Sequence, residues 1–242
     1  GPAFAPKPFD EHAAIERLDG GFFYVDLDRA AWPEIQARLG ELAAAPGVVF
    51  DLRGYPNSNH EILEHLVTEP DDTAWMFIPR FIYPDQQRQA GWQEESWGLV
   101  PAQPHIGGKV AFLVGPMAIS YAESVMGLVE GLHLGEIVGS ATAGANGNVN
   151  PFMVPGGYQI TYTGLRVTRL DGRQHHGIGV EPTVPATPTR AGIRAGRDEV
   201  LEAGLERVGA PPPKAATGKG KKKKTAAGKG PDAGKGAVPR YH

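Results

Sequence analysis

Ser120 is the residue whose type and setting most directly suggest chemistry. It follows a buried-strand pattern, Lys109 to Val114, and a Gly115-Pro116 loop, and residues 120–132 show the apolar spacing of a helix. The first N–H groups of a helix have no partner within it, and the helix dipole favours negative charge there. A serine at this point is therefore suited to attack a carbonyl group. The alternative is that Ser120 only caps the helix, as serines often do.

The elements that must position Ser120 alternate between strand and helix patterns. Strands are predicted at residues 21–27, 48–52, 109–114 and 136–139, and helices at residues 32–45, 60–68, 120–132 and 197–208. Shorter strands are predicted around residues 158–162 and 165–169, joined by a Thr163-Gly164 turn, and residues 69–105, with five prolines, as an irregular excursion. This alternation predicts an α/β fold with a mostly parallel sheet and flanking helices.

Five short blocks occur in a definite order between about residues 20 and 208. They are DLRGYP at 51–56, ISYAE at 119–123, VGSATAG at 138–144, DG at 171–172 with GIGVEP at 177–182, and GRDEVLEA at 196–203. Their order and wording resemble the carboxyl-terminal processing (tail-specific) serine peptidases and their tricorn relatives. The resemblance implies a β-β-α spiral core of the Clp-protease and crotonase type and no cofactor. It also implies hydrolysis of peptide bonds through Ser120, commonly near a substrate's C-terminus.

The general base is the point at which the sequence departs from that family. The processing enzymes use a lysine 25 residues after the serine, and this position holds Ala145. A histidine is the usual substitute because its pKa lies near neutrality. Alignment on the GVEP segment puts His176, with His175 beside it, near a catalytic glutamate of tricorn-like members. We therefore predict His176 or His175 as the base, with His60, which follows the DLRG loop, as the second choice.

Two alternatives stay open for the base. Residues 175–176 can be read simply as an exposed polar turn after Asp171-Gly172. A tricorn-type base lies far upstream of its serine, and would then fall outside this sequence.

The resemblance also assigns supporting residues. The oxyanion hole would use the backbone N–H groups of Gly54 and Tyr121, although the family's double glycine after DLRG is replaced here by Asn57-Ser58. Glu123, one helical turn after Ser120, is a candidate for orienting a polar partner, or simply a carboxylate near the positive end of the helix dipole. Asn148 and Asn150 are candidates for fixing a histidine or binding substrate backbone, or are ordinary turn residues.

Charge divides the chain into unlike parts. We assign residues 1–20 to an N-terminal start and linker, 21–210 to the catalytic core and 211–242 to a Lys-, Gly-, Pro- and Ala-rich tail for which composition predicts disorder. Nine of the 24 basic residues but only one of the 27 acidic residues lie in the tail, which leaves the rest near −11. The lysine run at 221–224 could contact an acidic partner, but no aromatic residue interleaves with it, which disfavours nucleic acid.

Composition excludes other classes of chemistry and anchoring. The chain has no cysteine, so disulfides and thiol catalysis are excluded, and no histidine spacing typical of a metal site is present. No apolar run approaches the roughly 20 residues of a membrane span. Gly1-Pro2 resembles the remnant of a removed affinity tag, so any targeting segment is expected upstream. The compartment stays open, and the resemblance slightly favours a secreted or periplasmic location.

Three functional readings follow. The first is an active serine endopeptidase that acts on protein or peptide substrates with a histidine base. The second is a peptidase fold that has lost its chemistry and binds a peptide or apolar ligand, as the missing lysine suggests. The third takes the basic tail as the functional element, with nucleic acid or a membrane surface as its partner. The ordered blocks favour the first.

Overall fold

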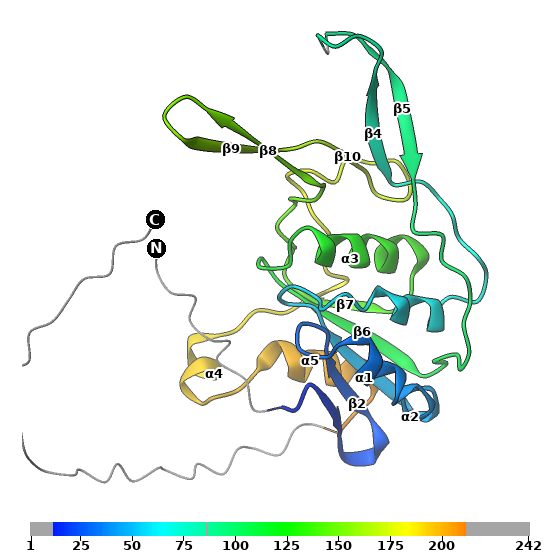
Figure 1. The fold of residues 1–242 in the computed structure, drawn as a ribbon. Coiled ribbons are helices and arrows are strands. Elements are labelled where there is room, and N and C mark those ends of the chain that lie inside the picture. Colours follow the sequence, from blue (N-terminus) through cyan, green and yellow to red (C-terminus); the bar gives the residue numbers. More distant parts are fainter. Residues whose placement is uncertain (1–11, 86, 212–242) are drawn as a thin grey trace, which may run out of the picture.

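A six-stranded sheet forms the centre of the protein in the computed structural model, which describes residues 12–85 and 87–211 (Figure 1). Its strand order is β1-β2-β3-β6-β7-β11. β1 is antiparallel to β2, and all the other neighbours are parallel, as predicted. The bounds are β1 Ile15–Arg17, β2 Phe23–Asp26, β3 Gly47–Asp51, β6 Lys109–Val114, β7 Glu136–Gly139 and β11 Val184–Pro185.

Helices cover both faces of this sheet because strand side chains alternate between the faces. Phe50 and Phe112 stack in the larger core, 5.2 Å between ring centroids, beneath α1 (Trp32–Gln36), α2 (Leu39–Ala44), the 3-10 turn η2 (His60–His65) and α3 (Tyr121–Leu132). The neighbouring Val49 and Leu113 face the opposite side and pack on α5 (Glu199–Val208). The short helices η1 (Asp19–Gly21) and α4 (Arg190–Arg194) complete the set.

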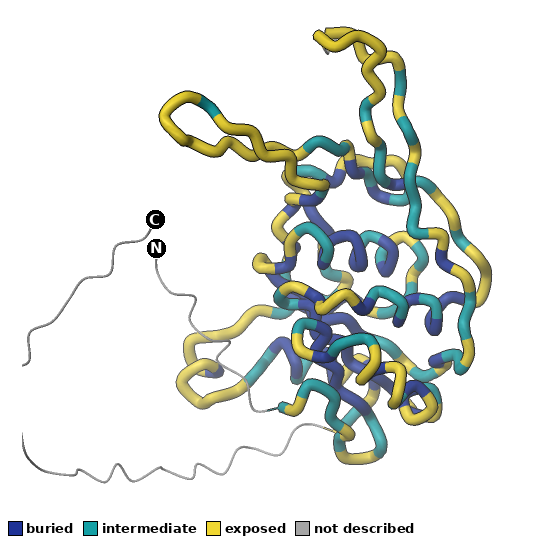
Figure 2. The backbone as a smooth tube through the Cα atoms, in the orientation of Figure 1, coloured by how far each residue is buried: buried dark blue, intermediate teal, exposed yellow. Residues whose placement is uncertain are grey.

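Two hairpins project beyond these layers (Figure 1). One is β4 (Met76–Phe81) with β5 (Gln89–Glu95), extended into a three-stranded sheet by β10 (Arg166–Val167). The other is β8 (Val149–Val154) with β9 (Tyr158–Thr163), almost entirely exposed (Figure 2). The layered body is thus well packed, and the hairpins are surface structures attached to it.

The structure corrects several local predictions. The helix predicted at 32–45 is two helices, because Arg38 leaves the helical conformation between them. Residues 60–65 form a 3-10 turn rather than an α-helix. The predicted irregular excursion at 69–105 contains the β4–β5 hairpin, with Pro79 on β4. The predicted hairpin with its turn at Thr163-Gly164 is wrong. β9 pairs with β8, the strand before it in the chain, and the turn between them contains Gly156-Gly157.

The basic tail, apart from Pro211, lies outside the described residues. Within the part of the chain that is described, no helix combines the length and apolar character needed to cross a membrane.

Candidate active site

Ser120 lies between β6 and α3 in a conformation that residues other than glycine rarely adopt. Its backbone angles are φ 55° and ψ −113°, outside the usual regions, which costs on the order of 1–3 kcal/mol. The Ser120 N–H donates to Ala145 O at 2.9 Å, which helps to hold this turn. The hydroxyl makes no capping bond to α3, so the capping alternative is wrong. Ser120 therefore carries backbone strain without the usual structural reason for a serine at a helix start.

The predicted oxyanion-hole residues lie on adjacent loops. β3 and β6 are parallel neighbours, and Leu52 N donates to Leu113 O at 2.9 Å, so the loops that follow both strands leave the same edge of the sheet. The Tyr55 and Tyr121 rings are 6.1 Å apart, which brings the DLRG loop against the start of α3. Among the described residues, neither the Gly54 nor the Tyr121 N–H donates a hydrogen bond. These two donors are available, and their role stays a prediction.

Gly54 is required by close packing. A Cβ built on it would lie 1.8 Å from Asp28 Oδ2, so no other residue fits this loop without moving Asp28. The loop is held from the other side by Arg53, which is bound to Asp51 at 2.6 Å and to Asp198 at 2.8 Å. Asp198 also caps α5 by accepting the Leu201 N–H. The first and last motif blocks are thus joined by one half-buried arginine.

Neighbouring carboxylates shift the pKa values of Arg53 and Tyr24. Burial alone would lower the pKa of the Arg53 guanidinium, but the bonds and charges of Asp51 and Asp198 raise it above its usual value. Burial and the Asp51 carboxylate raise the pKa of the Tyr24 phenol, which donates to Asp51 at 2.9 Å. Arg53 therefore stays charged and Tyr24 stays neutral at any working pH.

Glu123 is the centre of a second network beneath Ser120. Its buried carboxylate accepts the Thr142 hydroxyl at 2.5 Å and the N–H groups of Gly144 and Ala145 at 2.6 and 2.8 Å. The same Thr142 hydroxyl accepts the Val180 N–H at 2.8 Å. The second, third and fourth motif blocks are therefore tied together, and the tie includes Ala145, whose carbonyl holds Ser120.

His175 contributes to this network. It is 2% exposed, and its Nε2 lies 3.5 Å from Glu123 Oε1 with no other partner among the described residues. Burial alone would raise the pKa of Glu123, but the neighbouring His175, the Thr142 hydroxyl and the Gly144 N–H together lower it. Glu123 thus has several polar partners, and its role in orienting one of them for catalysis stays a prediction. His175 is buried and is not an exposed turn residue.

The other two candidate histidines lie elsewhere. His176 is half-buried, and its Nε2 accepts the Val167 N–H at 3.2 Å. His60 Nδ1 lies 2.7 Å from the Tyr121 hydroxyl, and its ring packs on Trp97 with 4.4 Å between centroids. Within the described part of the chain, no histidine is hydrogen-bonded to Ser120 Oγ. The sequence-based choice among the three is therefore not decided by direct contact.

Two residues near Ser120 escaped the sequence prediction. Asn146 is buried, donates to Ser124 Oγ at 3.1 Å and accepts the Gly147 N–H at 2.7 Å. Ser124 in turn lies 3.5 Å from Ser120 O. The signal for Ser124 was its position four residues after Ser120, on the same helix face.

The two asparagines that were predicted to assist lie in a different setting. Asn148 and Asn150 are exposed at the base of β8, where Asn150 Nδ2 is 3.5 Å from Asn148 O. Within the described residues, no group of three or more metal-binding side chains comes together.

Comparison with known proteins identifies the family. The model of peptidase family S41 matches residues 22–186. No curated protein matches the sequence. Among solved structures, a protein from Parabacteroides merdae named as a peptidase is 17% identical with a TM-score of 0.67, covering 80% of this chain and 63% of that one.

Two further structures share the fold. Mature CPAF complexed with lactacystin is 15% identical with a TM-score of 0.58, covering 72% of this chain and 48% of that one. The tricorn protease is 16% identical with a TM-score of 0.52, covering 77% of this chain and 17% of that one. The chain thus spans less than two thirds of these relatives, and the likeness confirms the predicted spiral α/β fold. The family resemblance of the five motif blocks is confirmed as well: the chain belongs to peptidase family S41.

Proposed function

We propose that this chain is the catalytic core of a serine endopeptidase in which Ser120 is the nucleophile. The observation that carries the proposal is the strained backbone of Ser120 at the start of α3, with a hydroxyl that makes no capping bond. Strain of this kind is kept at functional sites when the surrounding structure supports it. Membership of a peptidase family adds the reaction class.

The reaction follows from these groups. Ser120 Oγ attacks the carbonyl carbon of a peptide bond and loses its proton to a base. The carbonyl oxygen becomes an oxyanion that accepts the N–H groups of Gly54 and Tyr121. The base then protonates the leaving amine, and the C–N bond breaks to leave an acyl ester on Ser120. Water attacks this ester with the same base and releases the acid product and the free serine.

A histidine is proposed as the base, and the contacts favour His60 over the other two. The His176 Nε2 accepts an N–H, so the neutral ring carries its proton on Nδ1 and has no free acceptor. His175 is enclosed against Glu123. When His60 Nδ1 donates to the Tyr121 oxygen, Nε2 is the free acceptor, which is the arrangement of a base held by an orienting group.

A fluorophosphonate probe tests the nucleophile. We expect the wild-type chain to be labelled and Ser120→Ala to be unlabelled, with labelling mapped to Ser120 by peptide mass spectrometry. Ser96→Ala is the matched control, since Ser96 lies after β5 and outside the proposed machinery. Labelling of Ser120→Ala at the wild-type rate overturns the proposal. A wild-type chain that does not react while it binds peptide supports the inactive binding module instead.

Three single variants test the base. We expect His60→Gln to slow probe labelling by about 10²- to 10⁴-fold. His176→Gln should keep the wild-type rate. If His60→Gln, His175→Gln and His176→Gln are all labelled at the wild-type rate, the three histidines are excluded as the base and the Ser120 assignment is unaffected.

The proposed substrates are proteins or peptides, cleaved near their C-termini as in the processing enzymes. Mass spectrometry of the products from a peptide library checks this, since cleavage spread evenly along the chain contradicts the tail-specific part alone.

A further inference from the structure

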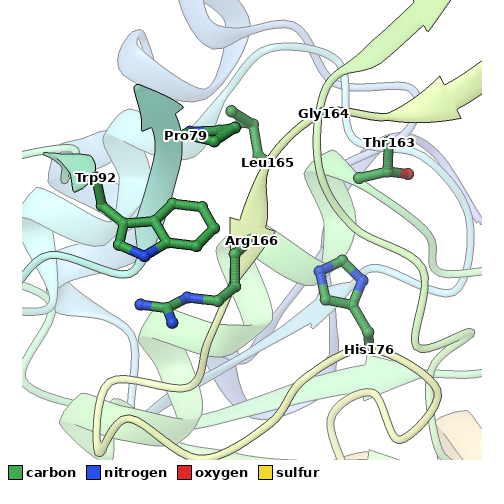
Figure 3. A pocket seen from close by; sticks show the side chains of 7 residues that line it. All are labelled: Pro79, Trp92, Thr163, Gly164, Leu165, Arg166 and His176. Atoms are coloured by element: carbon green, nitrogen blue, oxygen red, sulfur yellow. The ribbon is translucent and has the colours of Figure 1, made fainter. Parts of the chain in front are cut away.

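A pocket of about 370 Å³ lies where the two hairpins meet the body (Figure 3). The β4–β5 hairpin contributes two of its residues, the end of β9 and the segment that runs into β10 contribute four, and His176, just before the GIGVEP block, is the last. The lining residues are Pro79, Trp92, Thr163, Gly164, Leu165, Arg166 and His176.

Arg166 has an unusual setting in this pocket. Its guanidinium carbon lies 4.5 Å from the ring centroid of Phe77 and 4.5 Å from that of Trp92. Two aromatic contacts hold the planar group in place and leave the N–H groups at its edge free. Across the described residues, the Arg166 side chain makes no hydrogen bond and no ion pair. It is therefore a cation fixed by packing but without an anion.

Two further titratable side chains belong to this region, Glu94 on the same sheet face and His176 in the pocket lining. Glu94 shares this face of the sheet, since it lies opposite Phe77, which lies opposite Arg166, but it forms no ion pair with the arginine within the described residues. His176 adds a donor, because acceptance of the Val167 N–H by Nε2 leaves the proton of the neutral ring on Nδ1. The Arg166 guanidinium and the His176 ring line the same pocket, and a guanidinium matches a carboxylate, which it binds through two parallel hydrogen bonds.

The pocket borders the segment that holds the nucleophile. Gly177 N, next to His176, donates to Gly144 O at 2.8 Å, and Ser120 N donates to the neighbouring Ala145 O. A Cβ on Gly147 would lie 2.4 Å from the Thr163 side chain, so this segment continues directly to the pocket wall. An extended peptide with its scissile bond at Ser120 can therefore follow residues 144–147 to the pocket.

We propose that the Arg166 pocket is a substrate subsite that binds a carboxylate of the peptide, close in sequence to the cleaved bond. The inference rests on the proposed peptidase function. The carboxylate can come from an Asp or Glu side chain or from the chain terminus, since both present the same group.

Binding to the inactive Ser120→Ala chain tests the subsite without requiring cleavage. The probes are fluorescein-labelled decapeptides of Gly, Ala and Val that carry one Glu at each position in turn, paired with the same peptides carrying Gln. These peptides have amidated C-termini. One further peptide has no Glu and carries its only carboxylate at a free C-terminus. We expect one position, or the free terminus, to bind about 10- to 100-fold more tightly than its uncharged partner.

Variants of Arg166 identify the group responsible. Arg166→Met in the Ser120→Ala background should abolish the preference for the carboxylate while it leaves binding of the Gln peptides unchanged. Arg166→Lys should recover only part of it, because an ammonium lacks the planar two-donor edge. Glu94→Gln is the matched control on the same face and should keep or strengthen the preference. A carboxylate preference that is the same in Arg166→Met, or no preference at any position, overturns the subsite.

The two proposals fail in distinguishable ways. Arg166-dependent binding in a chain whose Ser120 does not react with the fluorophosphonate supports the subsite and contradicts the peptidase activity. A reactive Ser120 without any carboxylate preference supports the activity and contradicts the subsite.

Discussion

Ser120 and Glu123 lie one helical turn apart at the start of α3, and they differ in burial and in hydrogen bonding. Glu123 is buried and accepts three hydrogen bonds, with His175 beside it. The Ser120 hydroxyl is half-exposed and makes no bond to the helix, on a backbone in a disfavoured conformation. The comparison shows that a serine with a strained backbone can be held in place by a buried hydrogen-bond network one turn away.

The link between the two residues is the segment that follows β7. Glu123 fixes the N–H groups of Gly144 and Ala145, and the Ala145 carbonyl accepts the Ser120 N–H. In the processing enzymes the position of Ala145 holds the lysine base. In this chain the same position is held by backbone hydrogen bonds and carries alanine.

Removal of the Glu123 carboxylate should have the largest effect on stability. Glu123→Ala leaves the buried donors of Thr142 and Gly144 and the part-buried Ala145 N–H unpaired, and we expect a loss of about 3–5 kcal/mol in the free energy of unfolding. Urea denaturation measures it. Glu206→Ala, on the exposed side of α5, is the control and should change stability by less than about 0.5 kcal/mol. If Glu123→Ala and Glu206→Ala lower the free energy of unfolding by similar amounts, the Glu123 network does not stabilise the fold.

The next largest expected effect is the pH dependence of the stability that Glu123 contributes. The pKa of Glu123 is lowered from its ordinary value of 4.5 in the folded chain. Its stabilisation is therefore fully present above about pH 4.5 and is lost as the pH falls through the lowered pKa. We expect the stability gap between wild type and Glu123→Gln to be constant between pH 7 and about pH 5 and to narrow in more acidic solution. A gap that widens on acidification would contradict the sign of this shift.

Asn146 should give a smaller loss. Asn146→Ala removes a buried polar side chain and leaves the part-buried Gly147 N–H without its acceptor, at a cost of about 1–3 kcal/mol. Asn148→Ala, two residues away and exposed, is the matched control with almost no expected change. Thermal unfolding of both variants compares them directly. Equal midpoints would show that Asn146 does not stabilise the segment that holds Ser120.

Ser120 itself should give the smallest change, with the opposite sign. Glycine adopts a positive φ without steric cost, so Ser120→Gly should be more stable than Ser120→Ala by about 1 kcal/mol after the entropy of the unfolded glycine is subtracted. Alanine keeps the strain and is the reference for loss of the hydroxyl alone. Urea denaturation of the two variants decides the point, and a less stable glycine variant would mean that the backbone is not strained.

The sequence predicted four strands of the central sheet, β2, β3, β6 and β7, because they are short apolar runs bounded by glycine, which local pattern identifies. It missed the short edge strands β1 and β11, of which β1 lies in the stretch assigned to a linker. It predicted the place of Ser120 because the ordered blocks carry that information. The β4–β5 hairpin was missed because Pro79 and exposed aromatics break the strand pattern. The pairing of β9 was wrong because Thr163-Gly164 was preferred as a turn over Gly156-Gly157, although paired glycines are the stronger hairpin signal.

The site was less predictable than the sheet for a physical reason. Contacts such as those of His60 with Tyr121 and His175 with Glu123 join residues about 50 or more positions apart, and no local pattern encodes them. Adjacent histidines illustrate this, since His175 faces the Glu123 network while His176 lines the Arg166 pocket. Motif order can identify the block that carries a residue, but only the tertiary fold decides which way its ring points.

The bond between Arg53 and Asp198 has a consequence for the order of events during synthesis. The two residues are 145 positions apart, so the loop that carries Gly54 leaves the ribosome long before its anchor at the start of α5. Until then the Arg53 charge lacks one of its two carboxylate partners, and the loop lacks its far attachment. A nascent chain would therefore contain Ser120 for some time before the loop that carries Gly54 is fixed at both of its ends.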